Sequence, residues 1–235
     1  MPTQEQFQQA LEEASQQFAQ LIAQGNLDAP VASCPGWTLT ELAQHMCGTQ
    51  RWSTHALITG ERGEHPQAPA QRNELLAYFN EGMRELLEAS RSIDPQRPTW
   101  SFGPEPRIAQ FWTRRQAHEV TIHLWDAYSS QGQEYEIPED LAIDGLAEIV
   151  EVFFPMRMKR GNVGPLPQTL VLAPNDLTTT FELTTNTENN GPRITIHGPA
   201  ADLLLLLWGR KSLTELQIEG DATLAKEFLA QGVTP

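Results

Sequence analysis

Apolar residues change their spacing part-way along this sequence, and the change predicts two kinds of structure in one chain. In the first two thirds they recur at intervals of three and four, the period of a helix with one buried face. Similar stripes occur within 42–56, 75–87 and 107–128, and 141–154 predicts a fifth helix. Four amphipathic helices joined by loops predict a bundle. The first stripe consists of Phe7, Leu11, Ala14, Phe18 and Leu21.

The pattern after Pro155 is different. Segment 156–168 is rich in Gly and Pro and locally basic, which suggests a linker or a mobile loop over a site. It is followed by β-branched runs that predict strands, a Leu-rich helix, a further strand and a short helix capped by Asp221. We therefore predict an α+β protein of two domains, a helical bundle over 1–155 and a small α+β domain over 156–235. The elements expected in the second domain are strands at 169–173, 179–185, 193–197 and 213–219 and a helix at 200–208.

The charge of the chain excludes some classes of partner. Sixteen basic residues against thirty acidic ones give a formal charge of −14. A chain this acidic is repelled by phosphate backbones and by anionic membrane surfaces, so neither nucleic acid nor a membrane is expected as a partner. The N-terminus has no basic start followed by an apolar run, so we expect no secretory signal and a cytoplasmic protein.

The predicted helix at 107–128 carries an unusual polar stretch. Its stripe begins apolar and then continues as Arg115, Glu119, His123 and Asp126. Burying such groups without partners costs several kcal/mol each, so the stretch needs a reason. Glu119 and His123 are four residues apart and project side by side from one face, where they can hold two ligand positions of one metal. The alternative is a plain ion pair on the helix surface.

A third ligand would come from another helix, and His45 is the candidate. It lies between Leu42 and Met46, near the apolar stripe of the second predicted helix. Two His and one Glu leave a coordination position open, which is typical of catalytic zinc. Asp126 would then accept a hydrogen bond from the far nitrogen of His123. In the alternative interpretation His45 is a hydrogen-bonded core residue and Asp126 a solvated acid.

The two cysteines do not form a disulfide framework or a CxxC pair. Cys47 points about 200° away from His45 around the helix, which predicts a small core residue. Cys34 lies in a loop before a helix start, where a thiolate is favoured. The sequence offers no base beside it, so we do not predict a nucleophile there.

Four motifs together resemble one family. They read CPGWT at 34–38, LAQH at 42–45, RQAHEVTIH at 115–123 and WDA at 125–127. They resemble the mycothiol-dependent maleylpyruvate isomerase family, in which a DinB-like four-helix bundle precedes a small α+β domain resembling sterol-carrier proteins. Both halves match in order and size.

The resemblance implies a divalent metal, usually zinc, held at the positions of His45, Glu119 and His123. It also implies mycothiol as thiol cofactor and a small electrophile as substrate. Family motifs at Arg72 and Arg210 imply arginines that hold carboxylates of the substrate or cofactor, because a guanidinium fork suits a carboxylate. The alternative for Arg210 is a cation at a helix C-terminus, which is favourable by itself.

The resemblance predicts a reaction class. A metal-bound thiolate is a nucleophile at neutral pH. Its addition to an activated double bond, followed by rotation and release, is cis–trans isomerisation; stopping after addition is thiol S-transfer. The alternatives are a non-enzymatic small-molecule binding or sensor protein with a metal-binding bundle, and a protein that acts by partner contact with Glu119 and His123 as a buried pair. The sequence predicts no oligomeric state.

Overall fold

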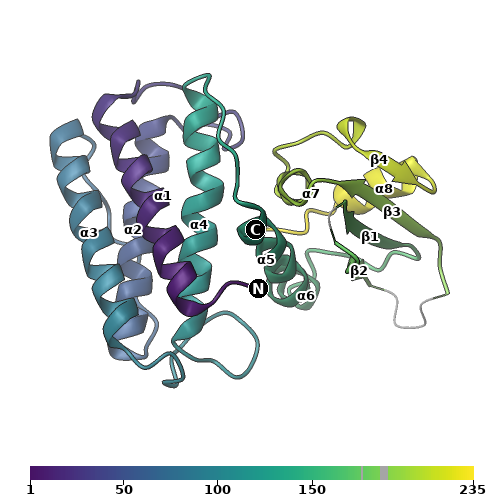
Figure 1. The fold of residues 1–235 in the computed structure, drawn as a ribbon, viewed down its shortest axis with the longest axis horizontal. Coiled ribbons are helices and arrows are strands. Elements are labelled where there is room, and N and C mark those ends of the chain that lie inside the picture. Colours follow the sequence, from purple (N-terminus) through teal and green to yellow (C-terminus); the bar gives the residue numbers. More distant parts are fainter. Residues whose placement is uncertain (176, 186–189) are drawn as a thin grey trace. The chain divides into compact units, whose positions relative to one another are not determined.

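The computed structural model describes residues 1–175, 177–185 and 190–235 (Figure 1). Its Cα positions divide the chain into two compact units. The first is Pro2–Ile137, and the second is Pro138–Pro235 together with Met1. The two units are described separately below.

The first unit, all of whose residues are described, is the predicted bundle. Helix α1 packs against α3 and α4, and α2 also packs against α3 and α4, so each helix has two neighbours. Figure 1 shows the four helices side by side. Their bounds are α1 Gln4–Gln24, α2 Leu39–Thr59, α3 Arg72–Ser92 and α4 Gln110–Ser130.

Local sequence signals explain where these helices begin and end. At the start of α2, Thr38 and Glu41 form the predicted capping box, and Gly60 ends the helix with φ of 80°, a conformation that glycine adopts without strain. Helix α4 begins at Gln110, later than the predicted Arg107. The backbone of 107–109 pairs with residues 97–99 instead, through Thr99 N to Arg107 O at 3.0 Å and Ala109 N to Arg97 O at 3.0 Å.

The second unit begins with a nearly continuous helical segment. It consists of α5 Glu139–Glu148, a π-helical turn at Ile149–Phe153 and α6 Phe154–Lys159. The remaining helices are α7 Ala200–Leu207, a 3-10 turn at Leu213–Glu215 and α8 Ala222–Leu229. In the described part of the chain no helix combines the length and the apolar character needed to cross a membrane.

Four strands within the described residues form one mixed sheet in the order β2-β1-β3-β4. Strands β1 and β3 are parallel, with Leu170 opposite Ile194 and Leu172 opposite Ile196; the outer pairs are antiparallel. These four apolar residues are fully buried, so they form the core face of the sheet. The bounds are β1 Thr169–Pro174, β2 Phe181–Thr184, β3 Arg193–Gly198 and β4 Gln217–Glu219.

The predicted boundary between the domains needs correction. We predicted it after residue 155, whereas the compact units divide between Ile137 and Pro138. The reason is that α5 packs against α7, so buried residues such as Leu146 belong to the core of the second unit. In addition, residues 156–159 are helical and not part of a linker.

Cys47 is a fully buried residue of α2, as predicted. Burial raises the pKa of its thiol to about 12. At pH 8 only about one ten-thousandth of that thiol is ionised, whereas an unfolded cysteine with a pKa of about 8.5 is about one quarter ionised.

We therefore expect a Cys34→Ser variant to resist an aromatic disulfide reagent at pH 8 while it is folded, and to release one equivalent of chromophore per chain when it is unfolded in urea. Rapid stoichiometric labelling of the folded variant would contradict the burial of this thiol.

Candidate metal centre

The facing sides of α2 and α4 bring three side chains together. His45 comes from α2, and Glu119 and His123 come from adjacent turns of α4. His45 Nε2 lies 2.9 Å from Glu119 Oε1, and His123 Nε2 lies 3.6 Å from the same oxygen. One donor atom from each residue falls within 4.8 Å of the other two. The structure thus unites the three residues that the sequence proposed as ligands.

These donors fit a divalent cation. Ligand bonds of about 2.0–2.1 Å at tetrahedral angles place neighbouring donor atoms about 3.3 Å apart. The two separations from Glu119 Oε1, 2.9 and 3.6 Å, lie on either side of that value. Two imidazole nitrogens and one carboxylate oxygen are a ligand set of catalytic zinc, which keeps one further position open.

Glu119 is held by a cation on its other oxygen. Arg115 Nη2 donates to Glu119 Oε2 at 2.5 Å, and the side chain of Arg115 is only 4% exposed. The other oxygen of Glu119, Oε1, lies near the two histidines. Burial raises the pKa of Glu119, but Arg115 and the hydrogen bonds from His123 and His45 outweigh it, so the pKa is well below its usual range. The carboxylate is ionised at neutral pH.

Sequence reasoning named Arg115 as part of the polar stripe and gave it no role. The signal was present, since Arg115 and Glu119 are four residues apart on one helix and such pairs are neighbours. What spacing alone does not give is the burial of the pair, and burial makes the interaction stronger than a surface contact.

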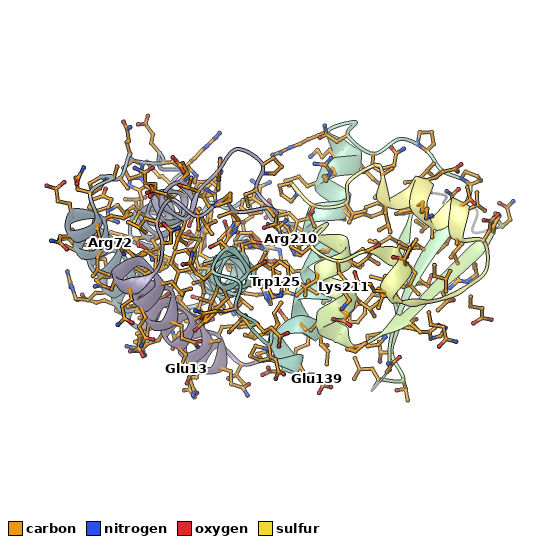
Figure 2. All side chains as sticks on the ribbon, turned by 90° about the horizontal axis from the view of Figure 1, so that it is seen from above. Glu13, Arg72, Trp125, Glu139, Arg210 and Lys211 are labelled. Atoms are coloured by element: carbon orange, nitrogen blue, oxygen red, sulfur yellow. The ribbon has the colours of Figure 1, made fainter. Side chains whose placement is uncertain are left out.

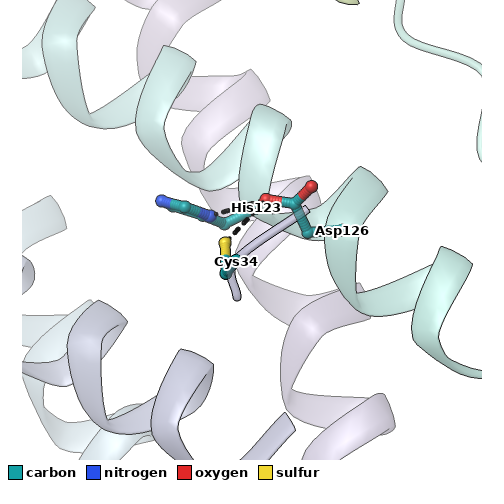
Figure 3. A group of neighbouring side chains, drawn as sticks. All are labelled: Cys34, His123 and Asp126. Atoms are coloured by element: carbon teal, nitrogen blue, oxygen red, sulfur yellow. Dashed lines mark hydrogen bonds and ion pairs between the residues drawn. The ribbon is translucent and has the colours of Figure 1, made fainter. Parts of the chain in front are cut away.

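His123 is oriented by a second carboxylate. Its Nδ1 lies 2.9 Å from Asp126 Oδ2, which directs Nε2 toward Glu119. Asp126 is fully buried, so the alternative of a solvated helix-end acid is wrong. Ser33 Oγ donates to Asp126 Oδ1 at 2.5 Å, and Cys34 Sγ lies 3.8 Å from Oδ2. Figure 3 shows the side chains of Cys34, His123 and Asp126 meeting at this point.

These contacts also set the charge of His123. Burial lowers its pKa, but hydrogen bonds with Asp126, Cys34 and Glu119 raise it by more, so the net pKa lies well above its usual range. Cys34, His123 and Asp126 form a second group whose donor atoms lie within 4.8 Å of one another. The expectation that Cys34 has no neighbouring base is therefore wrong, because the base comes from α4.

The loop before α2 places Ser33 and Cys34. Its two ends are joined by a bridge between Pro30 and Thr38, and Val31 N donates to Trp37 O at 2.9 Å. The ring of Trp37 lies 5.1 Å from the ring of His45. The loop is therefore closed on itself and contacts the centre through Trp37 and through Ser33 and Cys34.

The two arginines predicted to bind carboxylates each contact backbone carbonyl oxygens within their own unit. Arg72, labelled in Figure 2, begins α3 and donates to backbone carbonyl oxygens at the end of α1, those of Ile22 and of Gly25 (2.9 Å). Two of its donors thus close the C-terminus of α1. Arg210 lies in the second unit, where Nη1 donates to Trp208 O at 2.6 Å and the guanidinium lies 5.6 Å from the Trp208 ring centroid.

The fold and the centre define a class, that of two-unit proteins with a His–Glu–His cluster between two helices of an N-terminal bundle. Residues 9–128 match the family model described as "Mycothiol maleylpyruvate isomerase N-terminal domain". Residues 140–227 match the "MDMPI C-terminal domain". The chain therefore belongs to the mycothiol-dependent maleylpyruvate isomerase family.

Solved structures agree at the level of the fold. The chain is similar to the crystal structure of a mycothiol-dependent maleylpyruvate isomerase, with 17% identity, a TM-score of 0.65 and coverage of 94% of this chain and 95% of that one. It is similar to the same degree to a histidine-to-alanine mutant of that enzyme, with 16% identity. A comparison with curated protein sequences gave no match.

The Arg115–Glu119 pair leads to a prediction about stability. Replacing Arg115 by Met leaves the buried carboxylate without its largest favourable charge interaction. We expect metal-free Arg115→Met to lose about 3 kcal/mol of unfolding free energy, since breaking a buried ion pair from one side is strongly destabilising. Urea denaturation followed by circular dichroism measures the loss.

Two further variants control this measurement. The double variant Arg115→Met/Glu119→Gln should recover part of the loss, because the carboxylate left uncompensated by Arg115→Met is then neutral. Arg84→Met breaks the exposed pair with Glu88 on α3 and should cost less than about 0.5 kcal/mol. Equal losses in Arg115→Met and Arg84→Met would contradict the account.

Proposed function

We propose that this protein is a divalent-metal-dependent, mycothiol-using enzyme that isomerises an electrophilic double bond. The observation that carries the proposal is the grouping of His45, Glu119 and His123 around one point, with one oxygen of Glu119 directed inward by Arg115. Membership of the family supports mycothiol as the thiol. Zinc is the metal that best suits two imidazoles and one carboxylate.

The residues divide the work of holding the cation. His45, Glu119 and His123 provide the ligand atoms. Arg115 fixes the rotamer of Glu119, and Asp126 fixes the orientation of the His123 ring, as outer partners of metal ligands commonly do. When bound, the divalent cation lowers the pKa of a thiol at its open position, so that the thiol is a nucleophile at neutral pH.

Formal charge supports a thiol as the ligand of the open position. The three ligand residues together carry one negative charge when both imidazoles are neutral, so a divalent cation among them keeps a net positive charge. A site with that charge stabilises an incoming anion in a water-poor environment. The Glu119 carboxylate is only 16% exposed, which limits the water around it.

The reaction class follows from the structural neighbour and from the thiol. The neighbour is named for maleylpyruvate, a compound with an activated cis double bond. We propose that the substrate of this protein also contains such a bond. Reversible thiol addition isomerises such a bond, and irreversible addition would make the protein an S-transferase. The isomerase is favoured because it is the activity for which the neighbour and the family are named.

Arg210 stays a candidate for binding a carboxylate of the substrate or cofactor. Its Nη1 donates to Trp208 O at 2.6 Å. Arg72 has two donors on the carbonyls of α1, so we assign it to helix capping rather than to ligand binding.

The metal centre is tested by elemental analysis. Protein purified without chelator should contain about one divalent ion per chain, because three preorganised donors bind zinc tightly. His45→Ala, Glu119→Ala and His123→Ala should each lose that ion. His197→Ala, in the second unit, is the matched control and should retain it. A folded wild-type protein that takes up no zinc when dialysed against it would reject the proposal.

The reaction is tested by product analysis. With mycothiol and maleylpyruvate we expect many turnovers to the trans isomer and no net loss of free thiol. One molar equivalent of thiol consumed per molecule of electrophile would identify an S-transferase. If metal and thiol bind but no electrophile is consumed, the protein is a binding or sensor protein and the isomerase proposal is wrong.

A further inference from the structure

The face of α2 that carries His45 continues into an aromatic surface. Trp52 follows His45 by seven residues, so the two side chains point within about 20° of each other and lie about 10 Å apart along the helix axis. On α4, Trp112 precedes Glu119 by the same interval. The rings of Trp52 and Trp112 meet edge to face with centroids 4.9 Å apart. The two helices therefore face each other from the metal centre to the two tryptophans.

The loop after α2 returns over this same face. A β-carbon on Gly48 would lie 3.4 Å from His65 Nδ1, so His65 packs against α2 at Gly48, a position between His45 and Trp52 in the sequence of that helix. The rings of His65 and Trp52 have centroids 4.5 Å apart. The pKa of His65 is lowered, first by partial desolvation of its ring and then by the charge of His45, while the charge of Glu119 acts in the opposite direction. The loop thus lies close to the metal centre.

A pocket of about 570 Å³ opens here, within the size range of small-molecule sites. Its wall is the aromatic pair Trp52 and His65, and its rim carries Arg62 and Glu64, together with Gly63. The Arg62 guanidinium lies 5.6 Å from the Trp100 ring centroid. The pocket therefore combines ring faces with one strong hydrogen-bond donor group and one strong acceptor group.

This combination selects a class of ligand. A purely apolar ligand would desolvate Arg62 and Glu64 without replacing their hydrogen bonds to water. A polyanion would be repelled by Glu64. A neutral ring that carries hydroxyl groups satisfies both, because its C–H face packs on Trp52 and its hydroxyls pair with donors and acceptors alike.

We propose that this pocket binds the carbohydrate portion of the thiol cofactor, an inference that rests on the proposed function. Mycothiol joins N-acetylcysteine to a glucosamine–inositol unit, so its sulfur and its hydroxylated rings are separated within one molecule. With the sulfur at the centre formed by His45, Glu119 and His123, the spacing along α2 brings the rings to Trp52. The pocket then distinguishes mycothiol from simpler thiols.

The test measures thiol binding without turnover. In the cobalt-substituted protein, the sulfur-to-cobalt charge-transfer band reports thiol coordination, and titration with mycothiol and with N-acetylcysteine gives two dissociation constants. Wild-type protein should bind mycothiol at least about tenfold more tightly, since the sugar unit adds several hydrogen bonds and ring contacts. Arg62→Ala/Glu64→Ala should reduce this preference to within about twofold and leave the N-acetylcysteine constant unchanged.

Matched variants separate binding from folding. Arg84→Ala/Glu85→Ala removes an exposed arginine and a half-exposed glutamate from α3, outside the pocket, and should keep the wild-type preference. Trp52→Phe retains an aromatic face and should keep most of the preference, whereas Trp52→Leu should lose it. Arg62 and Glu64 are exposed, so their removal does not disturb the core.

Each outcome has one meaning. A wild-type preference that survives in Arg62→Ala/Glu64→Ala, or an equal loss of affinity for both thiols, overturns the pocket assignment and leaves the isomerase proposal standing. If the wild-type protein binds mycothiol no more tightly than N-acetylcysteine, the pocket assignment is also overturned and the isomerase proposal still stands. If neither thiol coordinates the wild-type cobalt protein, the proposed function fails and the pocket assignment fails with it.

Discussion

The largely buried carboxylate of Glu119, 16% exposed, is the constraint on which the site depends. An ionised group removed from water costs several kcal/mol unless charges and hydrogen bonds replace its hydration. Arg115 compensates it from one turn earlier on the same helix, and His45 compensates it from α2. The first contact is local and forms wherever α4 is helical. The contact of His45 with Glu119 requires α2 and α4 to pack side by side in one register. The packing of the bundle and the formation of the site therefore depend on each other.

Packing two turns away supports that register. The ring of Trp112 is fully buried, its indole nitrogen donates to Trp100 O at 2.7 Å, and Trp52 packs on its edge. Large aromatic rings bury much apolar area and tolerate little sliding. The contact of Trp52 with Trp112 thus fixes the separation of α2 and α4 at the tryptophans. This keeps His45 and Glu119 within ligand distance two turns away. Apolar packing offsets the cost of the polar centre beside it.

Interactions between residues close in sequence can be predicted from the sequence, whereas contacts between distant segments mostly cannot. Helical periodicity and the i,i+4 spacing of Glu119 and His123 are local, and both were readable. His45 was paired with them from residue type, position on its predicted helix and family motifs. The contacts of Ser33 and Cys34 with Asp126 were missed, because they depend on a loop folding back on a helix 92 residues later. The domain boundary was misplaced because an apolar helical stripe such as that of α5 does not reveal which core buries it.

The charges gathered on α4 explain why an anionic ligand suits the centre. Glu119 and Asp126 bring two carboxylates to His123, and Arg115 brings a positive charge to Glu119. Of the three proposed ligands only Glu119 is charged when the imidazoles are neutral, so a divalent cation held by them would keep an excess of positive charge. Because unbalanced charge is costly in a low-dielectric interior, an anion such as a thiolate is the ligand that this proposed cation would favour. Arg115 adds to the effect, since its charge offsets part of the negative charge of Glu119.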